Sequence, residues 1–101
     1  MLRVTTVRTD KRLRLVLEGE LASPWVAELF NEWNNVRASA RDRRVVVDLR
    51  NVTMISEEGE EILFGMMSGG ARFICRGVHN RHVLRQLTRK HRELNRRLAS
   101  L

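Results

Sequence analysis

Acidic side chains are concentrated in one short stretch, where Ser56 is followed by Glu57, Glu58, Glu60 and Glu61. If this stretch is helical, Glu57 and Glu61 are one turn apart, and two carboxylates so close together can share a proton or hold a metal ion. Helix electrostatics alone favour the same acids, because the N–H groups of a first turn attract negative charge. No second catalytic group accompanies them, so we interpret the stretch as a helix start and predict no catalytic residue.

Histidine and cysteine give two further candidate sites. His79 and His82 are three residues apart, a spacing that suits two metal ligands, but the sequence offers no third ligand beside them. Cys75 is the only cysteine and ends an apolar run, which indicates a small buried side chain and favours a reducing compartment. We therefore expect no metal ion and no cofactor. With no signal peptide and no membrane-spanning run in the sequence, a cytoplasmic location is predicted.

The acidic stretch follows a β-branched run, Val45–Val47, which lacks polar alternation and therefore predicts a central strand buried on both faces. We expect this strand to end at Asp48, a turn-forming residue. Ser56 is the predicted N-cap of the next helix, which should stop at Gly69. Partners of open α/β sheets meet the carboxyl ends of the strands, so the functional region is predicted between Asp48 and Glu61.

The rest of the chain supplies three more strands and two more helices. Residues 2–8 and 12–18 form a predicted hairpin, because leucine alternates with other side chains in the second segment. Residues 24–38 and 78–99 have the apolar spacing of helices, and residues 71–75 form a short apolar strand. At 101 residues the chain suits one domain. The order β-β-α-β-α-β-α predicts a single small α/β domain with a mixed, mostly parallel sheet.

Three segments together resemble the STAS domains, whose best-known members are the bacterial anti-sigma factor antagonists. Leu15–Ala22 resembles the second strand of the family and its exit, Val45–Val52 its central strand, and Ile55–Gly59 the loop that carries its regulatory serine. The order and spacing of the segments match over residues 2 to about 90. The resemblance implies a STAS-like fold and a non-catalytic regulatory role in signalling through protein–protein interaction.

One position departs from the antagonist pattern. In antagonists the loop reads Asp-Ser-Ser-Gly, and a partner kinase phosphorylates the first serine. Aligned on Gly59, this chain has Ser56 in place of the aspartate and Glu57 in place of the phosphorylated serine. The resemblance implies a partner-binding loop made of Asp48, Ser56, Glu57, Glu58 and Gly59, with a kinase-type anti-sigma factor or a related regulatory protein as the partner. A carboxylate at position 57 implies a module fixed in one state.

Two alternatives remain beside this interpretation. Within the same fold, the chain could be a STAS-like subunit of a transport complex or a small-ligand binder. The alternative from another class is a basic nucleic-acid-binding protein, because a net charge of +7 and a pI near 11.3 favour an anionic partner. Aromatic residues make up only 5% of the chain and are missing from its basic end, so platforms for stacked bases are lacking there. Nucleic acid is therefore the less favoured partner, bound weakly and in a salt-sensitive way at most.

The terminal helix carries most of the basic excess and also an apolar stripe. Its leucines recur at steps of three and four residues, with arginines between them. The first half of this helix is expected to cover the sheet, and the second half extends past what a domain of this size needs. Leu94, Leu98 and Leu101 are therefore predicted to mediate self-association, most simply as a homodimer.

Overall fold

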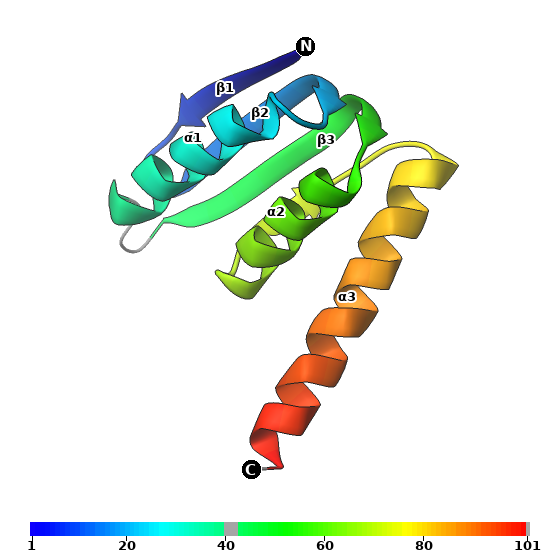
Figure 1. The fold of residues 1–101 in the computed structure, drawn as a ribbon. Helices are drawn as coiled ribbons and strands as arrows, with labels where there is room; N and C mark the ends of the chain where they lie inside the picture. The colour runs from blue at the N-terminus through cyan, green and yellow to red at the C-terminus, as the bar shows by residue number, and fades with distance from the viewer. Residues whose placement is uncertain (40–42, 101) are drawn as a thin grey trace.

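Residues 1–39 and 43–100 are described by a computed structural model, shown in Figure 1. The elements follow the predicted order, which confirms the expected α/β fold class: β1 (Leu2–Arg8), β2 (Arg12–Leu21), α1 (Val26–Ser39), β3 (Arg44–Ile55), α2 (Glu57–Ser68), β4 (Arg72–Ile74) and α3 (Val78–Ala99).

The four strands form one mixed sheet in the order β1-β2-β3-β4. The hairpin pair β1 and β2 is antiparallel, whereas β2 with β3 and β3 with β4 are parallel. Figure 1 shows α1 and α2 over the same face of the sheet, and α3 beside α2. The sheet is therefore mixed and mostly parallel, as predicted, and β3 lies between the two parallel neighbours.

The core lies between the sheet and the helices that cover it. Leu13, Leu15 and Leu17 of β2 are fully buried, whereas the alternating arginines of the same strand are exposed. Trp33 of α1 is buried in the core, and Trp25 packs half-buried against the core edge. The alternation in β2 thus fixes which face of the sheet the helices cover.

The predicted end of the central strand at Asp48 is wrong, because β3 continues to Ile55. Two register shifts explain the difference. Val16 pairs with Asp48 but Glu18 pairs with Asn51, and a second extra residue of β3 follows Val52. Such bulges let a strand accommodate turn-forming residues while it keeps its partner. The longer β3 is matched by β2, whose last residue, Leu21, pairs with Ile55.

The first helix begins at Val26 and not at Pro24. Residues 23–25 form a turn, and the N–H of Val26 donates to the carbonyl of Ala22 at 3.0 Å, so the turn leads directly into α1. This turn follows the end of β2 at Leu21, and it brings α1 back across the sheet. The exit of β2 is therefore fixed by this hydrogen bond at its junction with α1. The same strand end also contacts the start of α2, because the Leu21 carbonyl accepts the N–H of Ser56.

Candidate functional site

The start of α2 is fixed by Ser56, which is its N-cap as predicted. The Ser56 hydroxyl accepts the N–H of Gly59 at 3.1 Å and donates to the carbonyl of Leu21 at 3.3 Å. The backbone N–H of Ser56 donates to the same carbonyl at 2.9 Å. One serine therefore joins the helix start to the end of β2, and its half-buried hydroxyl is used within the fold.

Gly59 allows α2 to approach β2 closely. A Cβ atom at this position would lie 2.4 Å from the carbonyl oxygen of Leu21 and 3.0 Å from the Leu21 side chain. No side chain other than hydrogen fits this space without moving backbone. The glycine of the predicted loop is thus a packing residue in the first turn of α2, and it sets the helix start against the sheet.

The carboxylates of this first turn are displayed to solvent. Glu57, Glu58 and Glu61 are exposed, and Glu60 is half-buried. None of the four forms an ion pair with another residue in the described part of the chain. Together with the N-cap they form a negatively charged surface on a rigid helix start, which we call the α2 acidic turn (residues 56–61). Its charge is complementary to a cationic surface.

The α2 acidic turn borders a shallow groove toward α3. Glu57, Glu60 and Glu61 line one side, Lys90 lines the other, and Phe64 and Leu87 form the apolar part. The Phe64 ring meets the ring of His91 edge to face, with 6.1 Å between the ring centroids. The groove therefore combines charged and apolar side chains from α2 and α3.

Asp48 does not join this surface. It lies in the middle of β3, eight residues before Ser56 and roughly 25 Å away at about 3.3 Å per strand residue. The residue is only 4% exposed. The predicted partner-binding loop of Asp48 with Ser56, Glu57, Glu58 and Gly59 is therefore divided by the structure, because β3 does not end at Asp48.

Asp48 instead pairs with Arg50, a contact that sequence reasoning missed. The carboxylate accepts the backbone N–H of Arg50 at 3.0 Å and the guanidinium at 2.8 to 3.2 Å. The side-chain hydrogen bond from Arg50 lowers the pKa of Asp48 below the ordinary 3.8, burial opposes this, and the backbone hydrogen bond adds to the lowering. The spacing of an acid and a base two residues apart in a strand is the signal that predicts such a pair. The pair is structural and satisfies the N–H that the bulge frees.

Asn80 is a second residue that sequence reasoning missed. Its buried side-chain amide donates to the carbonyl of Val52 at 3.0 Å and so ties the first turn of α3 to β3. A polar residue between two histidines gives no sequence signal of this kind. His79 and His82 on either side are exposed. The start of α3 is therefore anchored to the sheet by hydrogen bonding as well as by Val83 and Leu87.

The second half of α3 extends past α2, as Figure 1 shows. Leu94 is 42% exposed and Leu98 is 58% exposed, so the predicted self-association stripe is accessible in the single chain. Leu101, the third residue of that stripe, lies outside the described residues. In residues 1–39 and 43–100, no helix is long and apolar enough to cross a membrane.

Comparison with solved structures places this architecture among known folds. The chain is similar to the crystal structure of an uncharacterized protein of the DUF3478 family with a SpoIIAA-like fold from Shewanella loihica PV-4. The TM-score is 0.53 at 12% sequence identity, over 78% of this chain and 71% of that chain. No protein-family model and no curated protein matches the sequence. The chain thus has a SpoIIAA-like fold, which confirms the fold that the STAS resemblance implies.

Proposed function

We propose that the protein is a non-catalytic STAS-like regulatory module that binds a protein partner through the α2 acidic turn. The observation that carries this proposal is a helix start fixed by the Ser56 cap, where the exposed carboxylates of Glu57 and Glu58 form no ion pair within residues 1–39 and 43–100. A surface held by Ser56 and Gly59 loses little conformational entropy on binding, so its charge can be used for recognition. The partner surface should be basic, and a kinase-type anti-sigma factor or related regulator is the partner that the resemblance implies.

The proposed module works in one state. Where an antagonist alternates between serine and phosphoserine, Glu57 carries a permanent charge of about half the size of a phosphate. Ser56 is no substitute for the missing serine, because its hydroxyl accepts the Gly59 N–H and donates to Leu21. A phosphate there would remove the hydrogen that Ser56 donates to the Leu21 carbonyl. Regulation of this module therefore acts through its amount or its partner.

Site-specific crosslinking in the source cell tests the proposal. A photo-reactive amino acid at Glu58 should capture one discrete protein, and the same amino acid at Asn31 on the exposed face of α1 should not. Glu57→Arg in the Glu58 variant should abolish the captured band, because it reverses charge beside the crosslinker. Capture that is equal at positions 58 and 31, or that survives Glu57→Arg, would remove the α2 acidic turn as the partner surface.

A kinase assay tests the fixed state separately. Anti-sigma factor kinases of the source genome, incubated with ATP, should leave the wild-type mass unchanged. The Glu57→Ser variant restores a hydroxyl at the antagonist position and should become a substrate, with the phosphate mapped to residue 57 by fragmentation. Phosphate on wild-type Ser56 would show that the alignment is displaced by one residue.

A further inference from the structure

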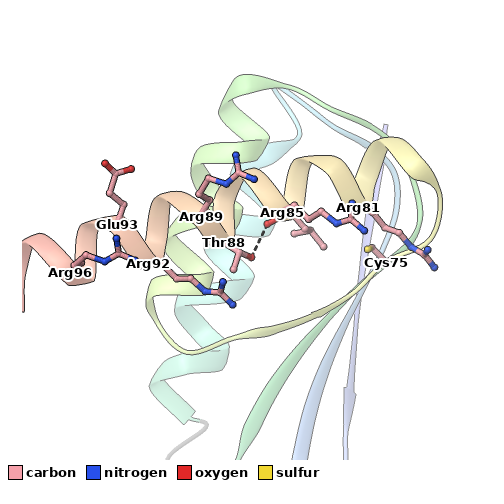
Figure 2. A pocket seen from close by; sticks show the side chains of 9 residues that line it. Cys75, Arg81, Arg85, Thr88, Arg89, Arg92, Glu93 and Arg96 are labelled. Atoms are coloured by element: carbon pink, nitrogen blue, oxygen red, sulfur yellow. Dashed lines mark hydrogen bonds between the residues drawn. The ribbon is translucent and has the colours of Figure 1, made fainter.

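A row of arginines runs along α3 on the side away from its leucine stripe. The row lines an open groove together with Cys75, Leu84, Thr88 and Glu93, and its members are Arg81, Arg85, Arg89, Arg92 and Arg96. Figure 2 shows these side chains spread along the helix, with Cys75 near the Arg81 end. At about 100° per residue, the five positions fall within a sector of roughly 80°. They span about 22 Å at about 1.5 Å per residue. We call this surface the α3 arginine groove.

The positive charge of the groove is not neutralised by the fold. Within the described chain, none of the five arginines forms an ion pair, and the nearby Glu93 pairs with Arg97 at 3.1 Å. All five are exposed. The Thr88 hydroxyl donates to the Leu84 carbonyl at 2.8 Å and so is used within the helix. The polar groups offered to a ligand are therefore almost all guanidinium groups, which carry charge at any physiological pH.

The chemistry of the groove favours a repeating polyanion over a protein surface. Protein interfaces depend on buried apolar or aromatic anchors, and among the lining residues only Leu84 and Cys75 are apolar. Guanidinium groups match phosphate oxygens in a two-pronged geometry, and here they recur about once per helical turn. The groove lacks aromatic side chains, so it offers no platform on which unpaired bases can stack.

From these observations we propose that the α3 arginine groove binds the phosphate backbone of duplex DNA without reading its sequence. A duplex is favoured over a single strand because stacking platforms are missing, and over duplex RNA because an α-helix fits the wide major groove of DNA and not the narrow one of RNA. Figure 1 shows α3 running on past the end of α2, and all five arginines of the groove are exposed to solvent. This activity is separate from the α2 acidic turn and does not depend on the partner proposed for it.

Binding of a fluorescein-labelled 20-base-pair DNA duplex, followed by anisotropy, tests the proposal. Four or five phosphate contacts give a slope of log K against log salt of about −3.6 to −4.5. Affinity should therefore fall roughly 150- to 500-fold between about 50 and about 200 mM NaCl. A slope shallower than about −2, or no binding at the lower salt concentration, would overturn the proposal.

Matched variants place the contacts on the groove. Arg85→Gln/Arg89→Gln/Arg92→Gln should lower affinity at least about tenfold and reduce the slope by about 2.7. The control Arg8→Gln/Arg12→Gln/Arg37→Gln removes the same charge from exposed positions on β1, β2 and α1, and should cost less than about threefold. Equal losses in both variants would mean that net charge alone attracts the duplex, which contradicts a groove. Circular dichroism should show equal helix content, since glutamine is a good helix former.

Three further measurements distinguish other ligands and a structural effect. Replacement of the same three groove arginines by lysine keeps the charge and should keep the salt slope. A loss of DNA affinity as large as that of the glutamine variant would indicate a structural effect of the substitutions. A 20-residue poly-glutamate peptide should compete poorly with the duplex. Competition at equal charge concentration would reassign the groove to an acidic protein segment. Tighter binding of duplex RNA or of a single strand than of duplex DNA would equally overturn the assignment.

Discussion

At the scale of single residues, the candidate site depends on two small residues, Gly59 and Ser56. Gly59 contributes no side chain, and yet the Leu21 carbonyl occupies the space that a Cβ would need. Ser56 contributes one hydroxyl that makes two hydrogen bonds. The acids of the α2 acidic turn are displayed to a partner because these two residues hold the helix start in place.

The close approach at Gly59 gives a first prediction. Gly59→Ala should destabilise the protein by roughly 2 kcal/mol or more, because the new methyl group overlaps backbone that cannot move freely. Gly65→Ala is the control, since a Cβ there meets nothing within 4 Å and the residue lies inside α2. That change should stabilise the helix by about 0.5 to 1 kcal/mol. Urea unfolding measures both, and equal effects would contradict the packing of α2 against β2.

The Asp48–Arg50 pair gives a second prediction, on acid stability. The pKa of folded Asp48 lies below 3.8, mainly through the Arg50 hydrogen bond, so the pair stabilises the fold above that pH. The stabilisation is lost as pH falls through the lower folded-state pKa. Asp48→Asn should therefore cost roughly 1 to 2 kcal/mol at about pH 7, limited by the partial exposure of Arg50, and much less at about pH 2.

Asp10→Asn is the control for this measurement, because Asp10 is an exposed acid in the hairpin turn. Its stability should follow that of the wild type at every pH. The difference in the free energy of unfolding between the wild type and Asp48→Asn could instead stay constant from neutral to acid pH. In that case the ion pair contributes nothing to stability, and Asp48 acts through its shape alone.

At the scale of elements, α3 has two unlike sides. Arg92 and Leu94 are two residues apart, which places them about 200° apart around the helix. One side is the α3 arginine groove, and the other carries the exposed Leu94 and Leu98. The first half of α3 is held to the sheet by Asn80 and to the core by Val83 and Leu87. The first half is thus fixed to the fold by its buried side, and the leucine side of the second half is left exposed.

The leucine side gives a third prediction, because two exposed leucines on a protruding helix favour packing against a second copy. Leu94→Glu/Leu98→Glu should shift the protein toward the monomer in sedimentation velocity runs at high concentration. Gln86→Glu/Asn95→Glu introduces the same charge at exposed positions of α3 and should leave the distribution unchanged. A wild-type protein that is monomeric at every concentration tested would contradict self-association through this stripe.

The elements themselves were predictable from the sequence, and the path of β3 was not. Apolar spacing found α3 over residues 78–99, and a serine followed by acids found the cap of α2. Asp48 misled because an aspartate after three valines favours a turn, whereas here its charge is balanced by Arg50 across a bulge. Tertiary pairing with β2 decided the outcome, and pairing between distant segments leaves little trace in local residue types.

At the scale of the whole molecule, the two proposed binding surfaces carry opposite charges. The net charge of +7 is dominated by arginine, and the α2 acidic turn is a negative surface within a basic protein. A basic partner therefore approaches against the overall field and must be attracted at short range by the turn itself. Duplex DNA is attracted by the overall field as well as by the α3 arginine groove. The two surfaces should consequently respond differently to salt.

The α2 acidic turn is tested most directly by titration calorimetry with the purified partner, which is the protein captured by the crosslinker at position 58. Its affinity is measured for the wild type, Glu57→Gln and Glu28→Gln. Glu28 lies exposed in the first turn of α1, so its replacement removes the same charge from the first turn of another helix. We expect Glu57→Gln to weaken binding about tenfold or more while it changes stability by less than about 1 kcal/mol, and Glu28→Gln to bind as the wild type does. Equal affinities of the three proteins would contradict recognition of the acidic turn and leave its glutamates as helix-stabilising residues only.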